Sequence, residues 1–454
     1  MYGTLGRTTL RNRLRAALTL PLLALALTGA ASWPGTAAAG RPPAQPRVGD
    51  VQLVSANVIG QPGSDVSSGE GWVAWSPDGS RIAFWSVASN LVPGKVGTPQ
   101  VIVKHLRAGT VALVSSTRTG RPGNGGSGAP TWSPDGTWIA FSSSASNLVP
   151  GTARNTLQVF VKRLRARAVT LVSSARNGEP GRGDSYLQTW SPDDSRVAFV
   201  SEAPNVVPGA ARRSPQLAVK DLRTGAITLV SSTPVGRPGD GRSGPGAWSP
   251  DGTRIAFWSH APNLVPGASR RTAQVVVKDL RTSAVVLVSS TAGGRPGNGG
   301  SGAPVWSPDG TRIAFSSSAP NLVPGVRGSA AQVVVKDLRT GAVALVSSTE
   351  GGRPGNADSG APAWSPDGTR IAFSSSASNL APGAAERRRQ VLAKDLRTGA
   401  VALVSSTDDG RPGDGASGFA AWSPDGSRIA FVSVASNLVP GAAGGQVYVK
   451  VVGR

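Results

Sequence analysis

The sequence predicts an all-β fold, a seven-bladed β-propeller with four antiparallel strands per blade, and three observations support this prediction. The first is a segment that reads Trp-Ser-Pro-Asp followed by an apolar alternation, as from Trp364 to Phe373. Its copies begin at Trp75, Trp132, Trp190, Trp248, Trp306, Trp364 and Trp422. The first two tryptophans are 57 residues apart, and every later pair is 58 apart. Self-similarity at a fixed period of this length is typical of repeat architectures.

The second observation is the pattern within one repeat, here residues 347–405. Ser365-Pro366-Asp367-Gly368 has the composition of a tight turn, because Pro presets φ, Asp caps and Gly accepts a positive φ. Apolar residues then alternate with a period of two, which indicates strands, and no window shows a sustained helical period. We therefore predict four strands in this copy, at residues 361–364, 370–375, 390–396 and 400–405.

The third observation concerns the two ends of the repeat region. After the last copy the sequence supplies only two further strands, residues 428–434 and 446–452, and the fourth is missing. Residues 50–55 match that missing strand, as comparison with residues 401–405 shows. We expect this N-terminal strand to complete the last blade and close the ring, which removes exposed sheet edges.

The repeat resembles the WD40-like PD40 repeat of TolB-type β-propellers, whose hallmark is Ser-Pro-Asp-Gly-x-x-Ile-Ala-Phe. Six of the seven copies fit closely, and the third departs at Asp194 and Val197. The resemblance implies periplasmic or extracellular scaffolding and protein interaction. It transfers no catalytic residue, because the hallmark residues are structural.

Composition and the N-terminal region predict export. Residues 1–39 combine four arginines, an apolar core and Ala37-Ala38-Ala39, as in a secretory signal peptide; the alternative is a membrane anchor, for which the apolar core is short. Residues 40–48 form a flexible lead-in, and the propeller comprises residues 49–454. The chain has no cysteine and a formal charge of +22, which excludes disulfides and favours acidic partners. We expect a secreted, extracellular or cell-envelope protein with no stable membrane insertion after signal removal.

A basic loop face is the first candidate binding surface. In an up-and-down blade, the connections between the second and third strands and between blades share one face, and here they are the long ones, which favours recognition there. The inter-blade connections carry Arg121, Arg237, Arg295, Arg353 and Arg411 in a repeated Gly-Arg-Pro-Gly segment. The other connections add Lys95, Arg154, Arg212, Arg213, Arg270, Arg271, Arg327 and residues 387–389. We expect an anion-binding rim, with a merely solvated rim as the alternative. Nucleic-acid binding is not expected, because the loops lack interleaved aromatic residues.

The third repeat departs most from the pattern and gives the second candidate site. It contains Glu179, Asp184, Tyr186, Gln188 and Glu202 at positions where the other copies differ. His260 occupies the Glu202 position of the next repeat, so the two side chains would lie on neighbouring blades. A carboxylate beside a histidine can perform acid–base chemistry or hold a metal; drift at exposed positions is the alternative. Trp72 and Phe419 share one repeat position in the first and last blades and are candidates for a contact patch or for filling the closure seam.

These observations support two principal functions. The first is a secreted binding scaffold that recognises an acidic protein or an anionic cell-envelope polymer, with Tyr186 and Trp72 added to the five arginines as binding candidates. The alternative is a propeller-type polysaccharide lyase or hydrolase with catalytic candidates Glu202, His260 and Glu179. Two histidines in total and no Gly-x-Ser-x-Gly motif argue against an enzyme. A passive structural module is the third possibility. No cofactor and no metal are expected.

Overall fold

The computed structural model describes residues 47–68, 72–91, 97–211, 214–265, 270–322, 330–383, 388–442 and 444–453. All of them belong to one compact unit, residues 44–454. Within these ranges there is no helix, and so none that could cross a membrane. The predicted signal peptide and most of the lead-in lie outside the described residues.

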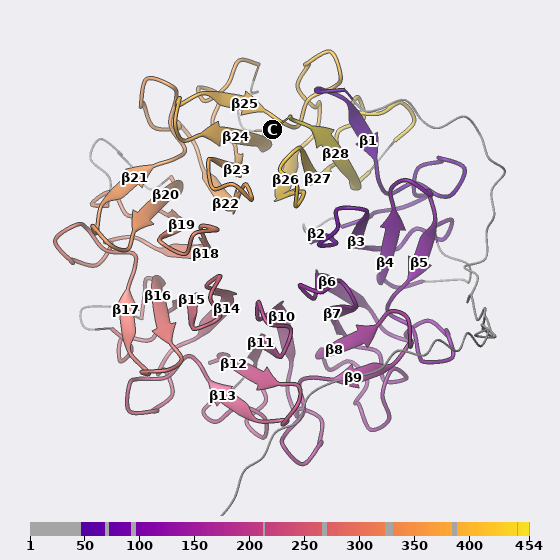
Figure 1. Cartoon of the computed structure of the whole chain (residues 1–454), viewed down its shortest axis with the longest axis vertical. Helices are drawn as coiled ribbons and strands as arrows, with labels where there is room; N and C mark the ends of the chain where they lie inside the picture. Colours follow the sequence, from indigo (N-terminus) through magenta and orange to yellow (C-terminus); the bar gives the residue numbers. More distant parts are fainter. Residues whose placement is uncertain are drawn as a thin grey trace, which may run out of the picture. The chain divides into compact units, whose positions relative to one another are not determined.

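The propeller prediction is confirmed: seven four-stranded antiparallel sheets are arranged in a ring (Figure 1). We name the strands of a blade a, b, c and d from the centre outward. Blade 1 contains β2 (Val73–Trp75), β3 (Arg81–Ser86), β4 (Gln100–His105) and β5 (Val111–Leu113). Blade 2 contains β6 (Ser127–Trp132), β7 (Trp138–Ser143), β8 (Gln158–Arg163) and β9 (Val169–Leu171). Blade 3 contains β10 (Ser185–Trp190), β11 (Arg196–Ser201), β12 (Gln216–Asp221) and β13 (Ile227–Leu229). Blade 4 contains β14 (Ser243–Trp248), β15 (Arg254–Ser259), β16 (Gln274–Asp279) and β17 (Val285–Leu287).

The remaining three blades follow the same order. Blade 5 contains β18 (Ser301–Trp306), β19 (Arg312–Ser317), β20 (Gln332–Asp337) and β21 (Val343–Leu345). Blade 6 contains β22 (Ser359–Trp364), β23 (Arg370–Ser375), β24 (Gln390–Asp395) and β25 (Val401–Leu403). Blade 7 contains β26 (Ser417–Trp422), β27 (Arg428–Ser433), β28 (Gln446–Val451) and, as strand d, β1 (Val51–Leu53).

Strand β1 closes the ring by pairing with β28, as predicted. Val51 lies opposite Lys450, and Leu53 lies opposite Tyr448. Beyond the ladder, the Ser55 hydroxyl donates a hydrogen bond to Gln446 Oε1 at 2.6 Å, and Val54 is fully buried. The last blade is therefore built from both ends of the repeat region and has no unpaired strand c.

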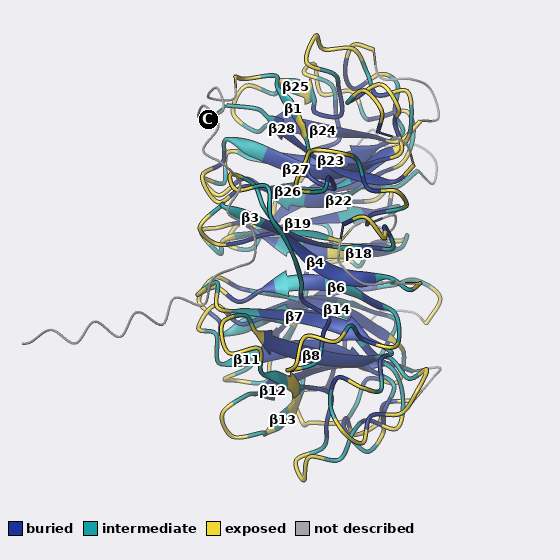
Figure 2. Cartoon of the chain, turned by 90° about the vertical axis from the view of Figure 1, so that its right-hand side faces the viewer, coloured by how far each residue is buried: buried dark blue, intermediate teal, exposed yellow. Residues whose placement is uncertain are grey.

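The hydrophobic core lies between blades. Each cluster combines strands of two neighbouring blades; one contains Val333 of blade 5 together with Ile371 and Phe373 of blade 6. Figure 2 shows buried residues along the strands and exposed residues in the loops at both ends. A single blade leaves these apolar faces in water, so the ring is the smallest arrangement that buries all of them.

The repeated tryptophan fastens each blade to the one before it. In six blades the indole Nε1 donates to the main-chain oxygen of the residue that precedes the previous tryptophan, at 3.0–3.3 Å. The arginine that opens strand b of the previous blade stacks on the same indole at 4.6–4.8 Å in six pairs. Trp248 is the exception in the first respect, because its buried Nε1 has no hydrogen-bond partner.

Because Trp248 lacks this hydrogen bond, replacing tryptophan by phenylalanine should destabilise the protein less at position 248 than at position 306. Trp306→Phe should lower the free energy of unfolding more than Trp248→Phe, by about 1 kcal/mol, because only Trp306 loses a hydrogen bond. Both indoles carry an arginine at 4.8 Å, so the stacking loss is matched. Chemical denaturation of both variants measures the difference, and equal losses would contradict the assigned role of the bond.

The seam between blades 2 and 3 is built differently from the others. Blade 2 has Trp138 where the other blades have arginine, and blade 3 has Asp194, at φ 59°, where the others have glycine. In five of the other seams the arginine donates to that glycine's oxygen, as Arg196 does to Gly252 at 3.1 Å. Here Trp138 packs against the cluster that contains Trp190, and Asp194 Oδ1 accepts the Asp135 N–H at 3.1 Å. The two departures therefore compensate each other.

The Ser-Pro-Asp turns are closed by their own side chains. Ser76 Oγ donates to Asp78 Oδ1 at 2.5 Å, and the Ser80 N–H donates to the same oxygen at 3.0 Å. Burial by itself would raise the pKa of Asp78, but these hydrogen bonds outweigh it and lower the pKa to about 2. The pKa of Asp425 is lowered to about 2 by the same balance, in which its partners are Ser423 and Ser427.

These lowered values predict a late acid transition. The ordinary aspartate pKa is about 4 and the folded value is about 2, so between these pH values the unfolded chain binds more protons than the folded ring. The aspartates' contribution to stability is therefore present above pH ~4 and is lost as the pH falls toward ~2. Urea unfolding at a series of pH values measures this loss. Asp425→Asn should reduce the slope in that window, and an unchanged slope would contradict the assignment.

A buried lysine in strand c of every blade was not foreseen. These lysines are 3–6% exposed, and they are Lys104, Lys162, Lys220, Lys278, Lys336, Lys394 and Lys450. Lys336 Nζ donates to the oxygens of Ser290 and Thr291 in the preceding connection and of Gly341 in its own turn, at 2.8–3.1 Å. Burial lowers the pKa of each, to about 8 for Lys104 and Lys162. These lysines therefore join neighbouring blades and do not contribute to the basic surface.

Candidate functional site

The five arginines of the Gly-Arg-Pro-Gly segments occupy one repeated, rigid turn, which we call the arginine turn. Arg121, Arg237, Arg295, Arg353 and Arg411 are all exposed. In each turn the threonine four residues earlier donates its N–H to the arginine oxygen at 2.8–2.9 Å. The arginine N–H in turn donates to the threonine hydroxyl at 3.0–3.2 Å. Each guanidinium is thus presented from a fixed backbone.

The arginine turns abut the turns between strands c and d of the following blade. A Cβ added at Gly120 would lie 3.9 Å from Nη1 of Arg167, and one added at Gly399 would lie 3.4 Å from the Glu350 oxygen. Lys278 Nζ bonds Thr233 of one turn and Ser283 of the other, at 3.2 and 2.8 Å. The inter-blade connections were expected to share a face with the connections between strands b and c, but their arginine turns lie beside the turns between strands c and d. Blade twist carries the end of strand d toward the next blade.

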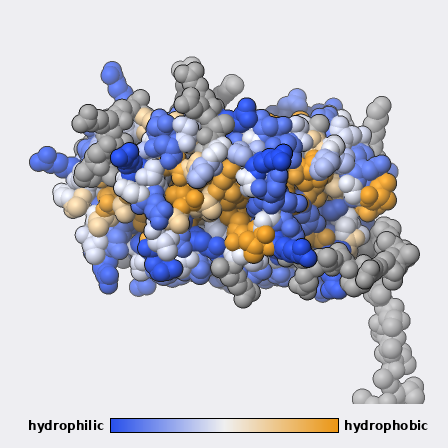
Figure 3. Space-filling model, turned by 90° about the horizontal axis from the view of Figure 1, so that it is seen from above, coloured by the Kyte–Doolittle hydropathy of each residue, from blue (hydrophilic) through white to orange (hydrophobic). Residues whose placement is uncertain are grey.

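The side wall of the ring, seen in Figure 3, shows what surrounds such turns. Hydrophobic residues gather at mid-height, and hydrophilic residues lie toward both faces. Valine and leucine at the ends of the d strands, such as Val401 and Leu403, are only half-buried. The positive charge of the turns is therefore carried beside a partly apolar wall.

The connections between strands b and c contribute separate cations. Arg154, Arg270, Arg271, Arg388 and Arg389 are exposed, and Arg270 pairs with Asp240 at 3.0 Å. Lys95, Arg212, Arg213, Arg327 and Arg387 lie outside the described residues. The described arginines of these connections add positive charge beside the inter-blade connections, since Asp240, the partner of Arg270, lies three residues after Arg237.

The candidate residues of the third blade are only partly brought together. Tyr186 donates its hydroxyl to Glu202 Oε1 at 3.3 Å, and burial followed by the charge of Glu202 raises the pKa of Tyr186 to about 12. Glu179 instead forms an ion pair with Arg182 at 2.6 Å. Asp184 Oδ1 accepts a hydrogen bond from the Leu157 N–H at 2.8 Å, so this side chain stabilises the backbone of the connection between strands b and c.

His260 belongs to a neighbouring aromatic group on blade 4. Its ring meets Trp258 edge-on at 5.7 Å between centroids, and its Nδ1 lies 3.1 Å from the Arg270 oxygen. Arg242 lies over Trp258 at 5.5 Å, and its charge also acts on Tyr186, so it links the two blades. Sequence reasoning missed Arg242 and Trp258 as members of this group. Gly244 leaves room for this indole, since a Cβ there would lie 1.9 Å from Trp258 Cε2.

The other singled-out residues have local roles. Gln188 is buried, accepts the Ser142 hydroxyl at 2.7 Å and donates to the Ala129 oxygen, so it joins blades 3 and 2. Trp72 is 37% exposed, and its oxygen accepts the Ser68 hydroxyl at 3.0 Å. Phe419 is half-buried, and its N–H donates to Ser374 at 3.2 Å.

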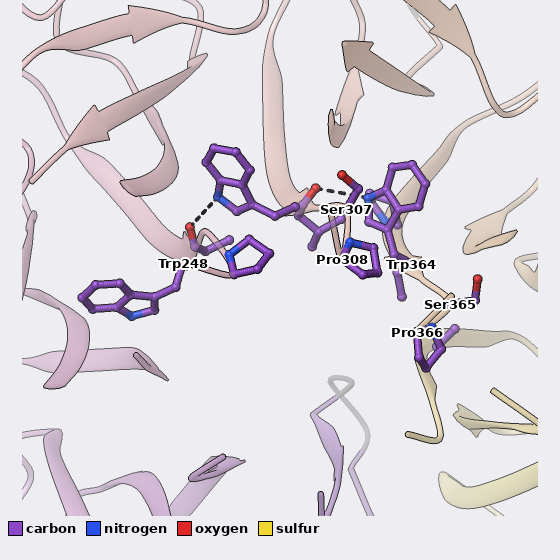
Figure 4. Close-up of a pocket in the computed structure, with 13 residues that line it drawn as sticks. Trp248, Ser307, Pro308, Trp364, Ser365 and Pro366 are labelled. Carbon is purple, nitrogen blue, oxygen red and sulfur yellow. Dashed lines mark hydrogen bonds between the residues drawn. The ribbon is translucent and has the colours of Figure 1, made fainter. Parts of the chain in front are cut away.

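A pocket lies beside the Ser-Pro-Asp turns of blades 4 to 6 (Figure 4). Its volume is about 520 Å³, and it is lined by Trp248, Trp306 and Trp364 with the prolines and serines that follow them. Figure 4 shows the indole–carbonyl bonds between neighbouring blades on this wall. The sequence analysis gave the tryptophans only a structural role and did not foresee that they also line a concavity.

Within the described ranges, no group of three or more histidine, aspartate and glutamate side chains is arranged to hold a metal ion. Among the candidate residues described above, the exposed guanidinium groups and the Tyr186–Glu202 and Trp258–His260 pairs offer polar atoms to a ligand. Their chemistry suits anion binding and hydrogen bonding to hydroxyl groups.

Comparisons with solved structures agree with the fold. An oligogalacturonate lyase in complex with manganese is 14% identical, with 89% of this chain and 91% of that chain covered and a TM-score of 0.54. A putative TolB from Agrobacterium tumefaciens is 16% identical, with 75% and 94% covered and a TM-score of 0.41. TolB from Acinetobacter baumannii is 20% identical, with 62% and 56% covered and a TM-score of 0.38, so the match spans less than two thirds of that protein. No family model and no curated protein matches the sequence. The likeness to the lyase, at this identity, is one of fold: this chain is a seven-bladed β-propeller.

Proposed function

We propose that this chain is an exported β-propeller scaffold, of the PD40 and TolB type that its repeat resembles, which binds an acidic protein or an anionic cell-envelope polymer through its arginine turns. The observation that carries the proposal is the repetition of one exposed, hydrogen-bonded arginine turn around the ring. Guanidinium groups form bidentate contacts with carboxylate and phosphate. Several identical turns on one rigid ring favour a ligand that carries repeated negative charges, since simultaneous contacts raise avidity.

Binding to immobilised polygalacturonate and poly-L-glutamate tests this proposal. The variant Arg237→Ala/Arg295→Ala/Arg353→Ala should weaken binding by about 100-fold, if each lost contact is worth roughly 1 kcal/mol. The matched control is Arg154→Ala/Arg271→Ala/Arg388→Ala, which removes three exposed arginines from the other connections and should change affinity little. Affinity should fall with added salt. Equal losses in both variants, or binding that ignores salt, would contradict the role of the arginine turns.

Export has its own test. Cleavage after residue 39 predicts that the protein recovered outside the cytoplasm begins at Gly40. N-terminal sequencing of that protein measures the start directly. Recovery of the uncut chain in the membrane fraction would support the anchor instead.

The second candidate function is a polysaccharide lyase or hydrolase near Glu202 and His260. The observation in its favour is the group formed by Tyr186, Glu202, Arg242, Trp258 and His260 on adjacent blades. An arginine beside an acid, a tyrosine and a histidine could bind a uronate and move a proton. The raised pKa of Tyr186 opposes its use as a base at neutral pH. Release of unsaturated or reducing ends from polygalacturonate, abolished by Glu202→Gln and by His260→Gln, would establish this function. Equal activity in both variants would exclude this site.

A further inference from the structure

We propose that the seam between blades 1 and 2 carries a site for a phosphate-bearing polyanion, formed by five arginines from two abutting turns. Arg118 and Arg121 come from the connection that leaves blade 1, and Arg163, Arg165 and Arg167 come from the turn between β8 and β9. All five are exposed, and none has an ion-pair partner within the described ranges. This inference rests on the proposed function and adds to it a specific seam and a ligand class.

The two turns are held against each other. Lys162 Nζ donates to the oxygen and the hydroxyl of Ser116, both at 2.6 Å, which ties blade 2 to the connection from blade 1. A Cβ added at Gly120 would lie 3.9 Å from Arg167 Nη1. The two arginine-bearing turns are therefore held side by side, and the Arg167 guanidinium lies next to the turn that carries Arg118 and Arg121.

In blade 2, the turn between β8 and β9 lacks two stabilising residues that the equivalent turn of blade 5 has, and arginine stands at both positions. The equivalent turn in blade 5 reads Lys-Asp-Leu-Arg-Thr-Gly, and Asp337 accepts the N–H groups of Arg339 and Thr340 at 2.9 and 2.7 Å. In blade 2 the aspartate is replaced by Arg163, which cannot accept these bonds. The glycine is replaced by Arg167, at φ 55°, in the left-handed region that favours glycine.

A third substitution supports one of these arginines. Trp138 lies opposite Arg163 in the pairing of β7 with β8, and the guanidinium carbon lies 5.7 Å from the indole centroid. The other blades have arginine at the Trp138 position. Arg167 introduces local backbone strain, and Arg163 removes the aspartate that capped the turn. Both changes introduce arginine, and Trp138 supports one of them. We take this as selection for positive charge in this turn.

The density of charge favours phosphate over carboxylate. In a linear polyphosphate every interior phosphorus carries one negative charge on two non-bridging oxygens, so successive charges lie closer together than carboxylates that are borne one per sugar ring, and each can accept from a guanidinium group. Five guanidinium groups on two short turns therefore match closely spaced phosphates along a linear polymer. A carboxylate polymer is the competing outcome of the test.

Inorganic polyphosphate and polygalacturonate of equal total charge are the probes. The variant Arg163→Asp/Arg167→Gly restores the repeated turn, so it should fold at least as stably as the unaltered chain, which thermal unfolding checks. It should lose about 10-fold or more of the affinity for polyphosphate. The control Arg154→Ala/Arg271→Ala/Arg388→Ala lowers the formal charge by the same three units and should lose less than about 3-fold.

The outcomes separate this site from the proposed function. If Arg163→Asp/Arg167→Gly binds polyphosphate as the unaltered chain does, or if the unaltered chain prefers polygalacturonate, the phosphate site is wrong while binding through the arginine turns can still stand. If polyphosphate binding depends on Arg163 and Arg167 but polygalacturonate and poly-L-glutamate are not bound, the site stands and the broader function fails. Loss of binding with all probes in the unaltered chain overturns both.

Discussion

A chain that begins at Ala56, and so lacks β1, should lose at least about 3 kcal/mol of its free energy of unfolding relative to a chain that begins at Arg47. Val54 is fully buried, and burying such a side chain contributes about 1.5–3 kcal/mol. The truncation also removes the Ser55 hydroxyl that Gln446 accepts and the ladder that covers Tyr448. The exposed edge of β28 would then be available to pair with another chain, which predicts oligomers at high concentration.

Chemical denaturation and size-exclusion chromatography measure these two effects. Adding a peptide of residues 47–55 should restore part of the stability, because the missing strand is supplied from outside. A truncated chain that remains monomeric and as stable as its parent would show that closure by β1 contributes little. The chain beginning at Arg47 is the matched control, since it retains the whole of β1.

Lys336→Ala should lower the free energy of unfolding by about 2–4 kcal/mol. The substitution removes three hydrogen bonds and leaves the oxygens of Ser290, Thr291 and Gly341 without their donor in a buried seam. An unsatisfied buried polar group costs roughly 1–3 kcal/mol, and part of this cost is relieved where water can enter. The loss falls on the contact between blades 4 and 5.

The matched control is Arg339→Ala, three residues away in an exposed part of the same turn. It should change stability by less than about 0.5 kcal/mol, as surface substitutions do. Lys336→Met keeps the apolar stem and should recover only the packing part of the loss. If Lys336→Ala and Arg339→Ala cost the same, the lysine does not fasten the blades.

The order of the strands could be predicted because it depends on local alternation and on copy number. Residues 370–375 were predicted as a strand and form β23, and the β1–β28 pairing followed from counting strands. Strand a was predicted too short: β22 begins at Ser359, because a bulge near Ala361, at φ 49°, lets the ladder resume beyond it. A small residue in the left-handed region leaves little trace in an apolar pattern.

The location of the arginine turns and the burial of the lysines could not be read from alternation. Both depend on how far each blade twists, which brings the end of one strand d against the next blade. A lysine beside an aspartate, as at Lys336-Asp337, looks like an exposed turn in a single repeat. Its presence at the same position in all seven copies was the available signal, because a residue repeated in every blade indicates a structural role.

The paired change at the seam between blades 2 and 3 limits how this ring can be rearranged. Blade 2 presents Trp138 and blade 3 presents Asp194, whereas blades 4, 5 and 6 all present the same arginine and glycine to their neighbours. Exchanging modules among the latter three preserves this arginine-to-glycine contact. Blades 2 and 3 would have to be moved together. If either were moved alone, Trp138 or Asp194 would face a blade that lacks the matching residue.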